Sequence, residues 1–153
     1  MKVCVLGAGA WGTSLAIHLA RNTSVTLWAR DASHLSGMKK SRSNPKYLGD
    51  FKFPALLSLN DNFKDSVLNC DFILSAIPTA GFRKALKDLK NIGSHAPILW
   101  ANKGLEASSA KLPFEVINDE FPSSNNILRS WGVLSGPSFA AELIRGLPTA
   151  VTI

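Results

Sequence analysis

The chain has 153 residues, of which 46% are hydrophobic, a composition that suits one globular domain with a sizeable core. Its formal net charge of +6 at pH 7 would attract anionic ligands such as phosphorylated substrates and dinucleotides. No run approaches the roughly 20 apolar residues of a membrane helix, and neither a secretory signal nor a recognised nucleic-acid-binding module is found. A cytoplasmic protein with no membrane span and no nucleic-acid partner is expected.

The first twelve residues carry the strongest signal in the chain. An apolar, β-branched run at Val3–Leu6 predicts a buried parallel strand, and a helical pattern follows it. Between them, Gly7 would make a tight turn, Gly9 would let the backbone approach a pyrophosphate, and Gly12 would allow close packing of helix on strand. The start of the helix offers free N–H groups to phosphates. This stretch predicts a dinucleotide-binding site.

A second strand is predicted at Ser24–Trp28, and its end bears on the choice of cofactor. The residue that contacts the adenosine ribose lies about 20 residues beyond the glycine turn, an acid for NAD or an arginine for NADP. Arg30 could pair with a 2′-phosphate. Asp31 could accept a hydrogen bond from a 2′-hydroxyl, or it could simply cap the following helix. The pattern favours NADP(H) and leaves the use of NAD(H) open.

The cysteines and histidines show no ligand spacing. Cys4 and Cys70 both fall in apolar runs, so both are expected to be buried thiols in a reducing compartment. The three histidines are scattered, and none pairs with a cysteine at the spacing of a metal site. The sequence therefore predicts no metal centre.

Residues 32–64 have the least regular pattern in the chain. The stretch 41–50 is rich in residues that break helices and strands and is expected to be an exposed loop. Leu56–Leu57 suggests a short strand or turn, and residues 60–67 suggest a short helix. Most of this segment is expected to be scaffold.

Strands and helices alternate in the rest of the chain. The predicted strands are 70–78, 96–101 and 131–135, and the predicted helices are 82–89, 112–121 and one beginning near residue 139. This alternation predicts an α/β fold with a doubly wound parallel sheet, a Rossmann-like dinucleotide-binding domain. A further strand begins at Pro148, and the sequence stops inside it.

Two strand ends supply candidate ligand contacts, because ligands of open α/β sheets lie outside the carboxyl ends of the strands. Lys103 follows the strand at 96–101 and is itself followed by the permissive Gly104. Gly136 and Ser138 come after the last full strand, with Ser138 as a plausible N-cap of the next helix. Free N–H groups there would form a second binding position, or the segment is only a well-capped helix.

Four motifs occur in order along the chain and together are far more specific than the glycine turn. They are Gly7-Ala-Gly-Ala-Trp-Gly-Thr-Ser14, Asn44-Pro-Lys-Tyr-Leu48, Asn102-Lys-Gly-Leu-Glu106 and Gly136-Pro-Ser-Phe-Ala-Ala-Glu142 through Gly146-Leu-Pro-Thr-Ala-Val151. The set resembles NAD(P)-dependent glycerol-3-phosphate dehydrogenase of the bacterial type. That resemblance implies the reduction of dihydroxyacetone phosphate to sn-glycerol 3-phosphate, the entry to phospholipid synthesis.

The resemblance also implies roles for individual residues. Together with the glycine turn, it makes the expected cofactor contacts Gly7, Gly9, Ala10, Trp11, Gly12, Ser14, Arg30, Asp31, Lys103 and Ala140. Lys103 would be the catalytic contact that reaches both substrate and nicotinamide, while Gly136 and Ser138 would bind substrate. The family's helical C-terminal domain, with its proton-transfer lysine, is absent. Residues 1–153 are therefore expected to be the N-terminal NAD(P)-binding domain, which binds dinucleotide with little or no turnover. A homodimer is a further expectation.

Two other interpretations stay open. One is another dehydrogenase with the same N-terminal fold, of the ketopantoate reductase or 6-phosphogluconate type, and the run 136–142 argues against it. The other is a non-catalytic dinucleotide-binding module that senses redox state. A lysine at a strand end favours an enzyme over a sensor.

Overall fold

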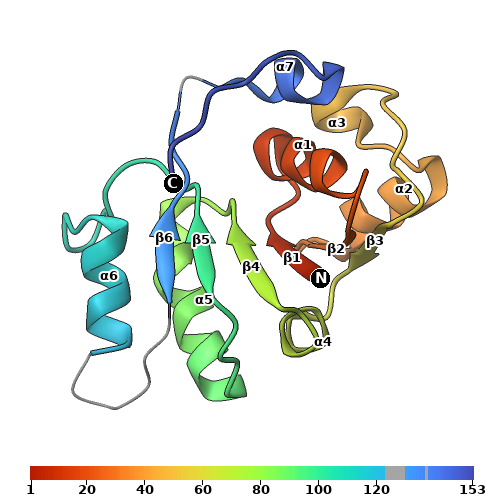
Figure 1. Ribbon diagram of the computed structural model, residues 1–153. Coiled ribbons are helices and arrows are strands. Elements are labelled where there is room, and N and C mark those ends of the chain that lie inside the picture. The colour runs from red at the N-terminus through yellow and green to blue at the C-terminus, as the bar shows by residue number, and fades with distance from the viewer. Residues whose placement is uncertain (123–129, 137) are drawn as a thin grey trace.

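A single parallel sheet organises the computed structural model, which describes residues 1–122, 130–136 and 138–153. Within these residues the sheet has six strands in the order β3-β2-β1-β4-β5-β6, and every neighbouring pair is parallel (Figure 1). The strands are β1 (Lys2–Leu6), β2 (Ser24–Trp28), β3 (Leu57–Asn60), β4 (Phe72–Ser75), β5 (Ile98–Trp100) and β6 (Trp131–Val133).

Helices cover both faces of this sheet. One face packs against α1 (Ala10–Leu19), α2 (Ala32–Ser41), α3 (Pro45–Leu48) and α7 (Ala140–Arg145). The other packs against α4 (Phe63–Leu68), α5 (Thr79–Ile92) and α6 (Pro113–Glu120) (Figure 1). The predicted doubly wound α/β fold is confirmed. No helix in the described ranges is both long and apolar enough to cross a membrane.

Strand β1 lies at the centre of the sheet and is buried on both faces. Val3 and Val5 point into the core beneath α1 and α2, whereas Cys4 and Leu6 point into the core beneath α5 and α6. A strand in this position must be apolar at every position, which is why Val3–Leu6 reads as a continuous hydrophobic run. Its pairing with both β2 and β4 puts the residues that follow Leu6 at the middle of the carboxyl edge.

Helix α1 starts directly above the glycine turn. Gly7 has a φ of 108°, a conformation that L side chains rarely adopt. A Cβ added at Gly12 would overlap the Gly7 carbonyl oxygen, and a Cβ added at Gly7 would lie 2.8 Å from the Ala76 carbonyl oxygen. Helix, turn and neighbouring strand end therefore touch through backbone atoms, which have no room to move.

Two segments differ from the sequence-based prediction. The stretch 41–50 is not an exposed loop: it contains α3, and Ser43 and Asn44 before that helix are fully buried. The predicted strand from Pro148 is also wrong, because only Thr152 pairs, in an isolated antiparallel bridge with Ser135. The polar composition of 41–50 predicts exposure and gives no sign that Asn44 is buried. At the other segment, a single bridge is too short to be a strand.

The close approach at Gly12 predicts a stability difference between two helical glycines. Gly12→Ala should lower the free energy of unfolding by ~1–3 kcal/mol, because the new methyl group meets backbone that cannot yield. Gly37→Ala in α2 is the matched control, since its Cβ would point into open space. That change should stabilise the protein by about 0.5–1 kcal/mol through helix propensity. Urea unfolding measures both, and equal stability of the two variants would contradict the packing argument.

Candidate dinucleotide-binding site

A cleft of about 1010 Å³ opens at the carboxyl edge of the sheet. It lies beside β1 and β4, where the strand order changes direction, which is the ligand position of open α/β folds. Most of the predicted site residues line it: Gly7, Gly9, Ala10, Trp11, Arg30, Asp31, Lys103, Ser138 and Ala140. Residues far apart in the sequence thus converge on one hollow.

The glycine turn forms the floor of this cleft. The Gly7 amide donates to the Trp28 carbonyl oxygen at 2.8 Å, and the Ala76 amide donates to the Leu6 carbonyl oxygen at 2.8 Å. Gly9 is the extended N-cap of α1, and a Cβ there would meet nothing within 4 Å. Open space therefore lies next to the free N–H groups of a ten-residue helix. These features fit a dinucleotide pyrophosphate.

Arg30 and Asp31 lie just after β2 and differ in the contacts that their side chains make. The Asp31 carboxylate is the N-cap of α2 and accepts from the His34 amide at 3.0 Å. That backbone hydrogen bond lowers the pKa of Asp31 below its usual value. The capping alternative for Asp31 is confirmed. In the described ranges, the exposed Arg30 side chain has no ion pair that holds it away from the cleft.

Asn44 is a structural residue of the site that sequence reasoning missed. It is fully buried, and its side-chain amide donates to the Ala8 carbonyl oxygen at 3.0 Å and to the Thr13 hydroxyl at 2.9 Å. We call these two hydrogen bonds the Asn44 clamp, because they tie α3 to both the glycine turn and α1. The cleft also gains His34, Lys46 and Tyr47 from this part of the chain, none of them predicted. The Asn44-Pro motif could have indicated this site, but the residues around it predict an exposed loop.

Lys103 enters the cleft from the segment after β5, and its backbone is held on two sides. The Thr79 hydroxyl donates to the Lys103 carbonyl oxygen at 2.8 Å, from the first turn of α5. Next to it, the Asn102 side-chain amide finds hydrogen-bond partners in the orientation in which its nitrogen donates to the carbonyl oxygens of Ser75 and Ile77, at 3.1 and 3.3 Å. The lysine side chain itself is exposed to the cleft.

Three predicted contacts do not line the cleft. Gly12 serves the packing of α1, and Gly136 packs against the Ala150 backbone. Ser14 is fully buried, with its hydroxyl 2.9 Å from the Ala10 carbonyl oxygen and 3.0 Å from that of Ala140. In this structure Ser14 therefore joins α1 to α7.

The predicted N-cap at Ser138 is wrong. Helix α7 begins after Phe139, and no side chain caps it, whereas the Ser138 amide donates to the Gly136 carbonyl oxygen at 3.0 Å. Pro137, which the prediction placed at this helix start, lies outside the described residues. Ser138 and Ala140 nevertheless reach the cleft because the chain bends back over α1.

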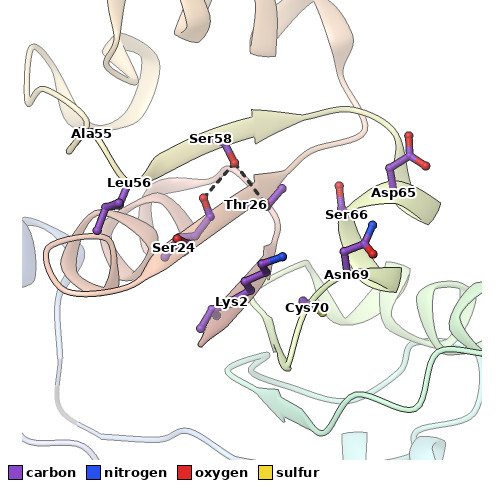
Figure 2. A pocket seen from close by; sticks show the side chains of 12 residues that line it. Lys2, Ser24, Thr26, Ala55, Leu56, Ser58, Asp65, Ser66, Asn69 and Cys70 are labelled. Carbon is purple, nitrogen blue, oxygen red and sulfur yellow. Dashed lines mark hydrogen bonds between the residues drawn. The ribbon is translucent and has the colours of Figure 1, made fainter.

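A second, smaller hollow of about 440 Å³ lies at the opposite, amino edge of the sheet (Figure 2). Two of its hydroxyl groups contact each other: the Thr26 and Ser58 oxygens are 3.2 Å apart, and Ser58 also donates to the Val25 carbonyl oxygen at 3.1 Å. Cys70 lines this hollow and is only half-buried, whereas Cys4 is fully buried. The prediction of two buried thiols is therefore correct only for Cys4. The described residues that line this hollow include neither a glycine turn nor the start of a long helix.

A parallel sheet that reverses its strand order beside a glycine turn and a helix start defines a Rossmann-type dinucleotide-binding domain. Comparison with known sequences makes the assignment more specific. The chain belongs to the family described as NAD-dependent glycerol-3-phosphate dehydrogenase N-terminus, whose model matches residues 2–153. The resemblance expected from the four motifs is confirmed. The family match does not favour either the sensor or the ketopantoate reductase interpretation.

Curated relatives and a solved structure agree with this family. A glycerol-3-phosphate dehydrogenase [NAD(P)+] of Methylobacillus flagellatus is 53% identical over 153 residues, which are all of this chain and 45% of that protein. One of Nitrosospira multiformis is 40% identical over 157 residues, again with all of this chain and 46% of that protein. The crystal structure of glycerol-3-phosphate dehydrogenase from Coxiella burnetii has a TM-score of 0.86 and 34% identity, covering 98% of this chain and 45% of that one. The chain spans less than half the length of these relatives.

The buried clamp at Asn44 predicts a loss of both stability and dinucleotide affinity. Asn44→Ala should lower the free energy of unfolding by ~1–3 kcal/mol, because the Ala8 carbonyl and the Thr13 hydroxyl lose their donor. Asn44→Asp should cost more, since a carboxylate would face the Ala8 carbonyl oxygen. Urea unfolding and calorimetric titration with NADPH measure the two effects.

The matched control is Asn69→Ala, which removes an exposed asparagine beside the smaller hollow. It should change the free energy of unfolding by less than about 0.5 kcal/mol and leave NADPH binding unchanged. The clamp is refuted if Asn44→Ala is no more damaging than Asn69→Ala.

Proposed function

We propose that this chain is the cofactor-binding part of an oxidoreductase that transfers hydride between NAD(P)H and the pair dihydroxyacetone phosphate and sn-glycerol 3-phosphate. The observation that carries the proposal is the convergence of Lys103 and the glycine turn on one cleft. Lys103 is a second cation in this cleft, and it follows β5, on the opposite side of β1 from Arg30. A cation there can face the substrate that reacts with the dinucleotide. The names of the relatives support this substrate pair.

The chemistry assigns one task to each part of the cleft. When bound, the dinucleotide supplies or accepts the hydride. A ketone that accepts hydride develops negative charge on its oxygen, and the Lys103 ammonium group stabilises that charge. Ser138 lies in the same cleft, so we assign it a substrate contact. Gly136 does not line the cleft and is packed against the Ala150 backbone, so we assign it no direct contact with the substrate.

The preference between NADP(H) and NAD(H) follows from whether the side chains of Arg30 and Asp31 already have partners within the protein. The Asp31 carboxylate already accepts the His34 amide as a helix cap, which reduces its capacity to receive a ribose hydroxyl. The Arg30 guanidinium lies in the cleft lining with its charge available. We therefore propose that NADP(H) binds more tightly than NAD(H), with the 2′-phosphate beside Arg30.

The same proposal places the chain in a reducing, cytoplasmic setting. Cys4 and Cys70 are both free thiols, which fits such a compartment. Assembly into a homodimer is a further prediction, for which sedimentation equilibrium of the purified chain is the test.

The cofactor assignment predicts how the purified chain binds dinucleotides. Trp11 lines the cleft, so its fluorescence should be quenched by NADPH and less strongly by equal concentrations of NADH. Arg30→Ala should weaken NADPH binding about tenfold, the effect of losing a charged hydrogen bond, and should leave NADH binding nearly unchanged. Lys39→Ala, which removes an exposed charge of α2 outside the cleft, controls for net charge. An equal loss for both cofactors would exclude contact between Arg30 and the 2′-phosphate.

The catalytic assignment predicts turnover only in the context of a full-length enzyme. We expect the 153-residue chain to bind NADPH and to oxidise it with dihydroxyacetone phosphate very slowly. A chimera in which this chain replaces the matching part of the Methylobacillus flagellatus relative should turn over the substrate. In that chimera Lys103→Met should lower kcat/KM about 100-fold or more, with a much smaller change in NADPH affinity. Equal loss of both would make Lys103 a cofactor anchor instead.

A further inference from the structure

The segment that carries Lys103 has no regular structure of its own. Residues 101–112 connect β5 to α6, and most of them are exposed, including Lys103 and Gly104. A group that stabilises charge in a transition state must nevertheless be held in a defined place. Glu106 anchors this segment. Only 7% of this residue is exposed, although its side chain carries a carboxylate.

Arg83 of α5 is the partner of that buried carboxylate. Its Nε donates to Glu106 Oε1 at 2.8 Å, and its Nη2 donates to Glu106 Oε2 at 2.7 Å. This is the two-bond arrangement that fixes the orientation of a carboxylate as well as its position. The hydrogen bonds from Arg83 and Ser109 lower the pKa of Glu106 to about 2.

The low pKa sets the pH range in which the anchor is intact. A carboxylate with a depressed folded-state pKa contributes its full stabilisation above its unfolded-state pKa and loses it as the pH falls through the folded-state value. For Glu106 that loss runs from the ordinary value of 4.5 down to about 2. Neutral and mildly acidic assays therefore all sample the paired state.

The rest of the segment closes around Glu106. The Glu106 amide donates to the Lys111 carbonyl oxygen at 2.9 Å, and its carbonyl oxygen accepts from the Ala110 amide at 2.8 Å. The Ser109 hydroxyl donates to Glu106 Oε2 at 2.6 Å. Movement of Glu106 would therefore move the whole turn between β5 and α6.

Helix α5 holds this segment at two points. Thr79 contacts the Lys103 carbonyl oxygen, and Arg83 contacts the Glu106 carboxylate. Residues four apart lie on the same face of a helix, so one rigid surface sets both ends of the span from Lys103 to Glu106. Thr79 fixes the backbone of the lysine directly, whereas Arg83 fixes the turn that follows it.

We propose that Arg83 is a positioning residue that, through Glu106, fixes the turn presenting Lys103 to the cleft. This inference rests on the proposed function in one respect, namely that Lys103 contacts the substrate. Arg83 itself touches neither the cleft nor any group that reacts. Its effect on catalysis is therefore indirect, and it should appear in kcat rather than in cofactor binding.

A purely structural role for Arg83 makes a different prediction. Its Nη1 also donates to Glu120 Oε1 at 2.8 Å and its Nη2 to Asp119 Oδ2 at 3.0 Å, so it links α5 to α6 as well. If that link were all that mattered, breaking the contact with Glu120 would harm activity as much as breaking the contact with Glu106. The two carboxylates can be removed separately.

The test compares Arg83→Met, Glu106→Gln and the double variant in the chimera described above. Each single variant should lower kcat about tenfold while KM for NADPH changes by less than about twofold, the pattern of a lost transition-state interaction. The double variant should be no worse than Arg83→Met alone, because that change already breaks the pair with Glu106. Arg83→Lys, which keeps the charge without the two-bond geometry, should recover part of the rate.

Glu120→Gln is the matched control, because it removes the charge from one of the two α6 carboxylates that Arg83 contacts and leaves the pair with Glu106. Its kcat should equal that of the unaltered chimera. A Glu120→Gln variant as slow as Glu106→Gln, or additive losses in the double variant, would overturn the proposal in favour of general packing.

A second measurement on the 153-residue chain separates this inference from the proposed function. In a heteronuclear NMR spectrum, Arg83→Met and Glu106→Gln should both shift or broaden the amide resonances of Lys103 and Gly104, and Glu120→Gln should not. If those resonances stay unchanged, Arg83 does not position the turn, whatever the chimera catalyses. If they move while the unaltered chimera fails to reduce dihydroxyacetone phosphate, the positioning holds and the proposed substrate is wrong.

Discussion

The contact between backbone atoms at the glycine turn is the constraint on which the rest of the structure depends. Helix α1 can begin at the end of β1 only if the residues at positions 7 and 12 have no side chains, because the Gly7 carbonyl and the Gly12 Cα face each other directly. That approach brings the helix start, with its free N–H groups, to the carboxyl edge of the sheet. Because the strands are parallel, the residues that follow β2, β4 and β5 lie at the same edge and surround the same cleft. A larger residue at either position would separate the helix from the sheet, and the cleft would lose its floor.

Charged and polar groups around the cleft divide into those that hold structure and those left available to a ligand. Asp31 caps a helix, Asn44 clamps the turn and Thr79 holds a backbone carbonyl, so each already has its partner within the protein. The side chains of Arg30 and Lys103, by contrast, lie exposed in the cleft lining. Both are cations, and they come from the ends of β2 and β5. This division suits an anionic ligand that extends along the cleft between these two strand ends.

The sequence was sufficient to predict elements whose pattern is strong within a few residues. The apolar run of β1, the glycine spacing and the strand end before Lys103 depend on local chemistry, and each was located correctly. The clamp by Asn44 could not be predicted in this way, because its partners lie 31 and 36 residues earlier in the chain. The same holds for Arg83, whose surroundings look like the solvated face of an amphipathic helix until α6 and the turn at Glu106 are brought against it. Ser14 shows the converse, since a motif position expected at the ligand has its hydroxyl directed at α7.

The bond between Ser14 and Ala140 has a consequence for how the protein is made. The two residues are 126 positions apart, and Arg21 reaches the Ile144 carbonyl oxygen across a similar separation. A ribosome that adds about 5–20 residues per second needs roughly 6–25 s to produce the second partner after the first. Through that interval the glycine turn and α1 exist without the helix that covers them, and β1 waits for β4 as well. The nucleotide cleft is therefore complete only after the residues near Ala140 have been synthesised. Until then, the core beneath α1 lacks Leu143 and Ile144, two of its buried residues.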